Sequence, residues 1–292
     1  MRKLLLFCVF CFFLSSGYAQ DLRLGFQAGL NFNHLSGPLE KDGTGRILEE
    51  MTTNSGFQIG AVANYPLLDF LGLRGELLFT QLGGRYRYHG QSFLHMPTES
   101  GKSVLLTGNK TLTLNINNAY FYLPLSVYIK PIKQVELSAG AGLGFLIAST
   151  AVGQLRFGGI TEGGQVLDTL EVSLIYNYLK DQTGNSNESI QQMLILDGES
   201  VAIPTRAGAY WLQARPEQGA AFNRWDFSLH AAIKLYLGQS LYLGGKIQYG
   251  LSDVSNDAFD YARYRPDADG QPIPRADKDT QLSYQIQVGF NF

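Results

Sequence analysis

Apolar and polar residues alternate strictly through the end of the chain. From Leu282 to Phe292 the even-numbered side chains are apolar or aromatic, and the odd-numbered ones are polar or glycine. A period of two places successive side chains on opposite faces of a β-strand. One apolar face, one polar face and a final aromatic residue are typical of a strand in an outer-membrane β-barrel.

The same alternation predicts seven more strands, so the expected fold is all-β: an eight-stranded antiparallel up-and-down transmembrane β-barrel with long extracellular loops. The expected strands cover about residues 22–34, 56–65, 70–82, 119–130, 134–148, 224–237, 240–252 and 281–292. Between them, short connections alternate with long ones at 35–55, 83–118, 149–223 and 253–280. Short periplasmic turns and long extracellular loops follow the rule for such barrels, with both termini on the periplasmic side.

Alternation alone does not distinguish a membrane barrel from a soluble lipocalin-like barrel, because each has one apolar and one polar face. The membrane interpretation is favoured because every strand carries an aromatic residue on its apolar face near the expected outer end. This expected aromatic girdle comprises Phe32, Phe57, Phe79, Phe121, Phe145, Trp225, Tyr249 and Tyr284. Such girdles mark the membrane interfaces of outer-membrane barrels.

The opposite face of the strands carries charges of both signs. They are expected to form an inward network made of Arg23, Arg74, Glu76, Glu136, Asp226, Lys234 and Lys246. An eight-stranded barrel is just wide enough for side chains to fill it, so the network is expected to plug the lumen; a proton or ion path is the alternative. Gly140, Gly142 and Gly144 share an inward face, and either they accommodate neighbouring tyrosines or they line a ligand cavity.

Two positions break the pattern on the fourth strand. Leu112, Leu114 and Ile116 are even-numbered, whereas the apolar residues from Phe121 onward are odd-numbered. We expect either a bulge at 117–119 or a strand whose upper half has left the membrane. Pro124 cannot donate to a β-ladder, so we also expect a local irregularity there.

The N-terminal residues are typical of an export signal. Arg2 and Lys3 precede an apolar run, and small residues follow, which predicts a signal peptide at 1–19 and a mature barrel domain at 20–292. Cys8 and Cys11 both fall inside the predicted signal, so no disulfide or cysteine metal site is expected. The formal net charge of −2 gives no indication of nucleic-acid binding.

Several short motifs resemble the PorT-type outer-membrane β-barrel family (outer membrane protein beta-barrel domain). They lie at 25–31 (GFQAGLN), 73–81 (LRGELLFTQ), 120–125 (YFYLPL) and the terminal Phe292. Members usually have proline at the position of Gly75 and an acidic residue at that of Tyr122. The resemblance implies an outer-membrane barrel of Gram-negative bacteria, and its name-giving members take part in a machinery that exports surface proteins.

Candidate catalytic chemistry is sparse. Some eight-stranded barrels modify lipids with a rim histidine and serine, and His34 lies beside Ser36, while the other histidines are His89, His95 and His230. No spacing brings a nucleophile, a base and an acid together. The Asp267–Gly270 segment lacks the further ligands of a calcium loop. No catalytic, cofactor or metal residue is therefore assigned, and the chain is expected not to be an enzyme.

The long connections are the expected place of function. The third, about 151–221, exceeds ordinary loops, and its segments 170–178 and 191–203 are expected to pair as a hairpin. The fourth places Tyr261 and Tyr264 among Arg263 and Arg265, a mixture that suits protein contact.

The expected function is thus structural or protein-interacting, within a secretion or surface-protein assembly. The alternatives are a small-solute binder or narrow transporter and an outer-membrane lipid enzyme. Expected partners are outer-membrane lipid, a protein at the extracellular loops and the barrel-assembly machinery, which would read the last strand and Phe292; no nucleic acid is expected.

Overall fold

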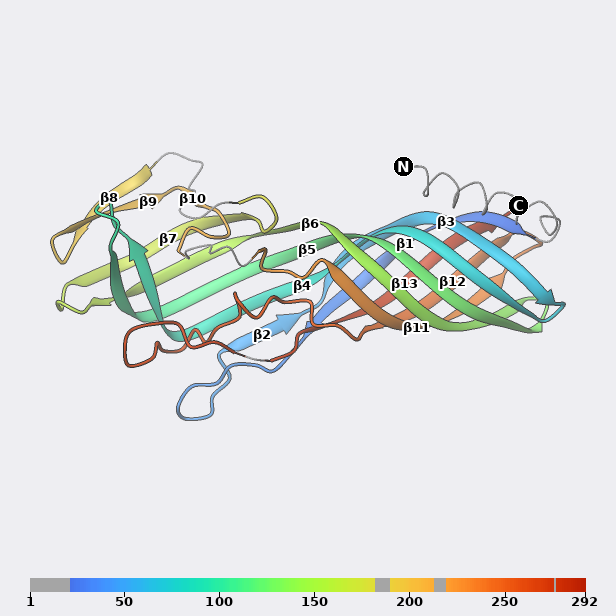
Figure 1. Cartoon of the computed structure of the whole chain (residues 1–292), viewed down its shortest axis with the longest axis horizontal. Coiled ribbons are helices and arrows are strands. Elements are labelled where there is room, and N and C mark those ends of the chain that lie inside the picture. Colours follow the sequence, from blue (N-terminus) through green and yellow to red (C-terminus); the bar gives the residue numbers. More distant parts are fainter. Residues whose placement is uncertain (1–21, 182–189, 213–218, 276) are drawn as a thin grey trace, which may run out of the picture.

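The computed structural model describes residues 22–181, 190–212, 219–275 and 277–292. The expected signal peptide, including Cys8 and Cys11, lies outside these residues. Within the described ranges every regular element is a β-strand, and there is no helix of the length and apolarity needed to cross a bilayer. The molecule is elongated, with a twisted ring of strands at one end and a projecting sheet at the other (Figure 1).

Eight strands pair in sequence and return to the first. They are β1 (Arg23–Ser36), β3 (Asn54–Leu68), β4 (Leu71–Pro97), β5 (Ser103–Ile132), β6 (Val135–Thr161), β11 (Trp225–Tyr236), β12 (Leu241–Gly250) and β13 (Thr280–Asn291). Each pairs antiparallel with the next, and β13 pairs with β1. These strands overlap the eight segments expected from the alternation. Short turns join β3 to β4, β5 to β6 and β11 to β12 at the end of the ring that holds the C-terminus (Figure 1).

The projecting sheet is built mainly from strands of the ring. β4, β5 and β6 run on far beyond the other ring strands, and β7 (Val166–Asn177) continues the sheet by pairing with β6. β2 (Glu49–Thr52) pairs with β4, and β10 (Arg206–Ala207) pairs with β7. β8 (Ile190–Leu196) and β9 (Glu199–Pro204) form a separate hairpin. The expectation that 83–118 and 149–223 are loops is therefore wrong, as is the pairing of 170–178 with 191–203.

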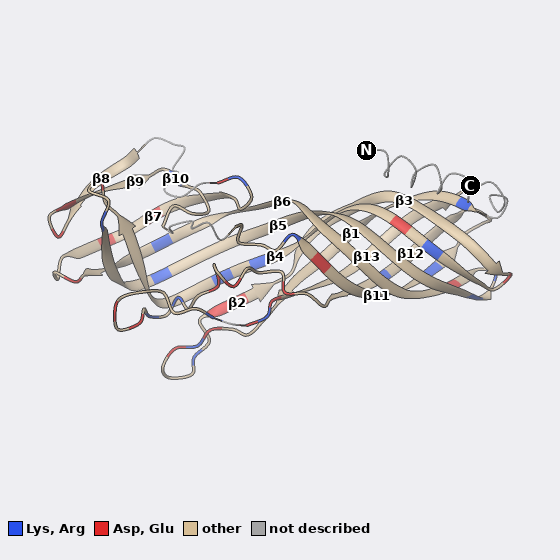
Figure 2. Ribbon diagram, viewed as in Figure 1, with Lys and Arg blue, Asp and Glu red and all other residues tan. Residues whose placement is uncertain are grey.

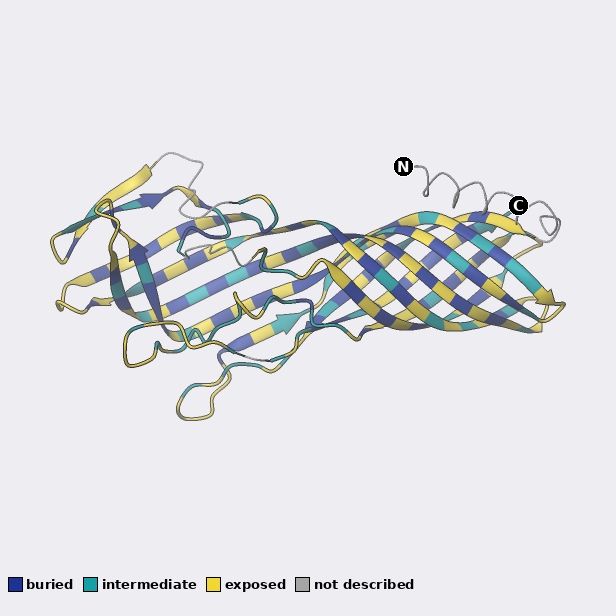
Figure 3. Cartoon of the chain, viewed as in Figure 1, coloured by how far each residue is buried: buried dark blue, intermediate teal, exposed yellow. Residues whose placement is uncertain are grey.

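Apolar side chains cover the outside of the ring and line the inside of the projecting sheet. On the ring, exposed and buried residues alternate along each strand (Figure 3), and the exposed ones include Leu30, Phe121, Leu229 and Ile286. In the projecting sheet, buried apolar side chains such as Leu112, Leu155 and Phe157 form a continuous core. This reversal is expected where a strand passes from lipid into water, because the apolar face must then turn away from the solvent.

β5 and β6 achieve this reversal in different ways. On β5 the even-numbered residues point inward throughout, and the sequence itself changes from inward Tyr120 and Tyr122 to inward Leu114 and Ile116. On β6 the register with β5 shifts between Ala119 and Tyr120, so that β6 contains one extra residue there. Such a bulge moves the following side chains to the other face. The bulge expected on β5 lies on its partner β6, and β5 itself runs on beyond the ring without one; the alternative that its upper half has left the membrane stays a prediction.

The parts of the strands that the sequence does not predict begin at this reversal. The alternation predicts strands with apolar residues on the outer face, so the prediction ends where that face becomes polar. Gly83 lies at the same level, opposite Asn117, with a φ of 134° that side chains rarely adopt. The irregularity at Pro124 is confirmed, because the β4–β5 ladder lacks the pairs between Gly75–Leu125 and Leu78–Tyr122.

Candidate functional site

Five of the seven residues expected in the inward network meet inside the ring. Arg74 pairs with Glu136 at 2.5 Å, and Lys246 and Lys234 lie 2.6 and 4.0 Å from Glu76. All five side chains are buried, and Figure 2 shows both charge signs in the ring strands toward the end that holds the C-terminus. Gln27 and Tyr242 extend the contacts around Glu76 through hydrogen bonds. Side chains therefore occupy this part of the lumen.

The other two residues lie elsewhere. Asp226 is buried farther along the lumen, where its carboxylate accepts a hydrogen bond from Ser252 at 2.8 Å. Arg23 is exposed at the open end of the ring and lines a cavity of about 210 Å³ together with Lys130 and Phe292. The sequence identified the inward face of these residues but not which of them meet.

Two of the three inward glycines, Gly142 and Gly144, lie beneath tyrosine rings, whereas Gly140 lies against the backbone of Leu125 and Ser126. A Cβ on Gly142 would come within 2.4 Å of the Tyr122 hydroxyl, and one on Gly144 would meet the rings of Tyr122 and Tyr120. Tyr122 in turn hydrogen-bonds Ser228 on β11. The described residues thus give these glycines a packing role.

The expected girdle residues lie on the outer face of the ring. Cross-strand pairing joins Phe79 to Phe121, Phe121 to Phe145 and Phe145 to Trp225, and Phe32 pairs with Tyr284. The rings of Phe145 and Trp225 lie 4.9 Å apart, and those of Phe57 and Phe79 5.6 Å apart. Tyr249 is also exposed. An outward position is required of girdle residues, and the girdle itself stays a prediction.

The histidines do not meet at one site. His89 contacts Thr111, His95 contacts the carbonyl of Gly270, and His230 is buried in the lumen. His34 lies at the rim beside exposed Ser36. Among the described residues, no histidine has a hydrogen bond to a serine or a carboxylate, and no group of three metal-ligating side chains was found.

A large hollow lies in the projecting part of the molecule. It has a volume of about 1210 Å³ and lies between the β4–β7 sheet on one side and residues 208–212, 221–222 and 254–275 on the other. Exposed residues such as Lys102 and Asp257 also line it, so it opens to solvent. Ligand cavities usually have a volume of about 300–1,000 Å³. This cavity is large enough for an organic molecule, and we treat it as the candidate site.

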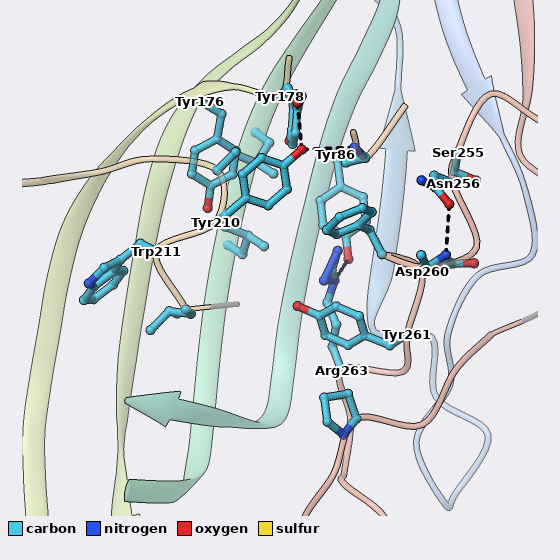
Figure 4. A pocket seen from close by; sticks show the side chains of 18 of the residues that line it. Tyr86, Tyr176, Tyr178, Tyr210, Trp211, Ser255, Asn256, Asp260, Tyr261 and Arg263 are labelled. Atoms are coloured by element: carbon cyan, nitrogen blue, oxygen red, sulfur yellow. Dashed lines mark hydrogen bonds between the residues drawn. The ribbon is translucent and has the colours of Figure 1, made fainter. Parts of the chain in front are cut away.

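Aromatic side chains form much of the cavity wall. Tyr176, Tyr178, Tyr210 and Trp211 lie on one side, and Tyr86 and Tyr261 face them with Arg263 (Figure 4). Tyr210 is fixed in place, because its hydroxyl donates to the carbonyl of Tyr178 and accepts from the main chain of Ala221. Apolar residues of the sheet complete the wall: Leu112, Leu114, Ile116, Leu155 and Leu174.

A network of charged residues closes one side of the cavity. Arg275 pairs with Glu49 at 3.0 Å and with Asp277 at 2.6 Å, and it lies 3.9 Å from Asp260. Burial, together with a hydrogen bond to Asp277, raises the pKa of Asp260 to about 7. Burial likewise raises the pKa of Asp279 to about 6. Both carboxyl groups therefore carry less negative charge near neutral pH than ordinary aspartates.

Two cations on the cavity wall have no carboxylate partner. Lys110 donates only to the carbonyl of Phe93, and burial followed by the charge of Arg263 lowers its pKa to about 7. Arg263 donates to the hydroxyl of Tyr86. Among the described residues neither of these side chains has an ion pair.

The sequence pointed to part of this site for another reason. The sequence predicts a protein-contact surface made of Tyr261, Tyr264, Arg263 and Arg265. Of these, Tyr261 and Arg263 face the cavity, and Arg265 is exposed. The other wall residues were missed because they were assigned to loops. The sequence does contain a signal for these residues. From Val104 to Ile116 the even-numbered residues are mostly apolar, which indicates a strand whose even-numbered face is buried, whereas in the ring part of the same strand the apolar face is odd-numbered.

Comparison with known proteins agrees with the fold. Residues 18–256 match the family model described as outer membrane protein beta-barrel domain, so the chain belongs to this outer-membrane β-barrel family. No curated protein sequence matches the chain.

Among solved structures, the chain is similar to Ail, the attachment invasion locus protein of Yersinia pestis, with 9% identity, a TM-score of 0.36 and coverage of 94% of this chain and 100% of Ail. It is also similar to OprG from Pseudomonas aeruginosa, with 10% identity, a TM-score of 0.33 and coverage of 92% and 95%. A third is the P. putida toluene transporter TodX, with 12% identity, a TM-score of 0.28 and coverage of 92% and 90%. At such TM-scores these likenesses carry no information on function.

Proposed function

We propose that this member of the outer-membrane β-barrel family is a surface binding protein. An eight-stranded transmembrane barrel, filled by its own side chains, holds an extracellular sheet whose cavity takes up a small organic ligand. The observation that supports this most is the cavity of about 1210 Å³ with its aromatic wall. The sequence alone favours protein contact over small-ligand binding, whereas the cavity supports small-ligand binding.

The lumen supports binding rather than transport. The Arg74–Glu136 and Lys246–Glu76 pairs cross the inside of the ring and are almost fully buried. An eight-stranded barrel leaves little interior space beyond its side chains. The separation of the histidines supports a non-catalytic role. We also propose that residues 1–19 are a signal peptide, that the girdle residues lie at the membrane interface, and that the assembly machinery recognises Phe292.

The test fills the cavity and measures dye binding. Ala209 lines the cavity, so Ala209→Tyr should lower the affinity for anilinonaphthalene sulfonate by at least about tenfold in nanodiscs. Energy transfer from Trp211, which also lines the cavity, reports bound dye when Trp225 is changed to Phe. Ala268→Tyr, on an exposed part of the 254–279 segment, is the matched control. Equal binding by both variants would refute the cavity as the site.

A second candidate function is protein contact within a PorT-type secretion or surface assembly. It is favoured by strand β8, on which Met193 and Ile195 are 44% and 61% exposed. Exposed apolar side chains on an edge strand are typical of a contact surface. A stoichiometric complex purified from native membranes should be lost with Met193→Asp and Ile195→Asp but kept with Gln192→Asp. Recovery of the barrel alone from unmodified membranes would remove this candidate.

A further inference from the structure

The guanidinium of Arg263 is held at the cavity wall with most of its donors free. Its Nε donates to the Tyr86 hydroxyl at 2.8 Å, and its Cζ lies 5.2 Å from the Tyr86 ring and 5.5 Å from the Tyr261 ring. Figure 4 shows Arg263 beside these two rings. Within the described ranges its Nη1 and Nη2 atoms have no hydrogen bond or ion pair. Aromatic faces stabilise the charge but leave the guanidinium edge available.

The main chain around Arg263 fixes this position. Its backbone N–H donates to both carboxylate oxygens of Glu40 at 2.9 Å, and its carbonyl accepts from Ser92 at 2.5 Å. Glu40 thus contacts the backbone and does not pair with the guanidinium. A cation placed in advance loses little conformational freedom on binding, which favours affinity.

Burial opposes the charge of Arg263, whereas the nearby carboxylates of Glu49 and Glu40 help to raise its pKa; among the described residues, neither carboxylate pairs with the guanidinium. The nearby carboxylate of Glu49 is engaged by Arg275 and by the Tyr86 hydroxyl. Lys110 is a second basic group on this wall, and burial followed by the charge of Arg263 lowers its pKa to about 7, so that it is partly charged near neutral pH. Asp260 and Asp279 are on the lining too, and burial raises the pKa of each carboxyl group. The free edge of the Arg263 guanidinium is therefore the point of this wall at which an anionic head group can pair.

The remaining wall is apolar or aromatic. Leu112 and Leu155 belong to the sheet, and Trp211 lies on the facing segment. A mostly apolar cavity with one well-placed charged group selects ligands that have an apolar body and a complementary head. The planar guanidinium matches oxyanions through paired N–H donors.

We propose that the cavity binds an organic anion, whose carboxylate, sulfate or phosphate head contacts the free Nη groups of Arg263 while its apolar or aromatic body lies against the leucine and tyrosine wall. This inference rests on the proposed binding function and adds the ligand class.

The test compares two dyes that share a ring system. Anilinonaphthalene sulfonate carries an anionic head, and phenylnaphthylamine lacks it. In zwitterionic nanodiscs, with Trp225→Phe and energy transfer from Trp211, the anionic dye should bind at least about tenfold more tightly. Arg263→Gln should weaken the anionic dye by about ten- to a hundredfold, the usual range for a hydrogen-bonded charge, and the neutral dye by less than about twofold.

Two further variants make the result specific. Arg265→Gln removes the same side chain from an exposed site two residues away and should change neither dye. Arg263→Lys keeps the charge and should retain part of the preference for the anion. If Arg263→Gln does not fold, Lys110→Met should also reduce binding of the anionic dye alone. Equal affinity for both dyes, or equal loss of both in Arg263→Gln or Lys110→Met, would overturn the anion class.

This outcome can be separated from failure of the proposed function. If Ala209→Tyr blocks both dyes but charge has no effect, the cavity binds ligands and the anion class is wrong. If Ala209→Tyr blocks neither, both proposals fail. Nanodiscs that contain anionic lipid identify the source of the anion. If dye binding is weaker in them, and Arg263→Gln does not show this weakening, the anion is a lipid head group. Unchanged dye binding indicates a soluble anion, and either result supports the anion class.

Discussion

Replacing Glu76 by Gln should destabilise the barrel by about 3–5 kcal/mol, the cost of removing one partner of a buried ion pair. The carboxylate lies 2.6 Å from the Lys246 ammonium and 4.0 Å from that of Lys234, and all three side chains are at most 3% exposed. Within the described residues the Lys234 ammonium has no hydrogen bond. Glutamine has nearly the same shape, so the change removes charge and leaves two buried like charges facing each other.

The assay is urea unfolding of the protein in lipid vesicles, followed by the fluorescence of Trp225 with Trp211 changed to Phe. The matched control is Glu50→Gln, which removes an ion pair with Arg87 at 3.3 Å whose side chains are both 56% exposed. An exposed pair contributes only about 0.5 kcal/mol.

Adding Lys246→Met to Glu76→Gln should restore part of the loss, because it removes one of the unpaired charges. A loss below about 1 kcal/mol for Glu76→Gln, or one equal to that of Glu50→Gln, would refute the reasoning. It would show that water solvates these lysines and that the lumen is not closed by side chains.

Three further predictions concern the lumen and the extracellular part. Single-channel recordings of the intact protein should show no stable conductance, and large steps would contradict the plugged lumen. Phe157→Ala should cost about 3–5 kcal/mol in the core of the projecting sheet, since Phe157 is 0% exposed. If that sheet is extracellular, as proposed, protease added to whole cells should then cut it, while the heat-dependent gel shift of the barrel persists. Ile160→Ala, at an outward position, should have no effect. The protection factors of the 254–279 segment, which are exchange rates corrected for the intrinsic effect of pH, should be higher at pH 5 than at pH 8. Because burial raises the pKa of Asp260 to about 7 from 3.8, the folded state holds a proton that the unfolded state has lost, so stability falls as pH rises between these values. Asp260→Asn should reduce this difference, and better protection at pH 8 in the unmodified protein would contradict it.

Part of the candidate site was accessible from the sequence. Arg263 and Tyr261 stand out as an aromatic and cationic cluster, and the even-numbered run from Leu112 to Ile116 signals a buried face. The cavity itself was not accessible, because Tyr86, Tyr210 and Arg263 come from distant parts of the chain and meet only through long-range packing. Nor does the sequence show that the Arg263 guanidinium retains free donors, which depends on where Glu40 and Glu49 place their carboxylates.

The sequence by itself determined the strands of the barrel and the direction of their side chains. Lipid outside and side chains inside impose a period of two on every membrane strand, so the local order of residues is enough to predict these strands. Only the tertiary structure decided what happens beyond the membrane. There the period is kept but the buried face is reversed, through the sequence change on β5 and the bulge on β6. Local alternation is the same for either face, so the environment that selects the face appears only when the strands are assembled.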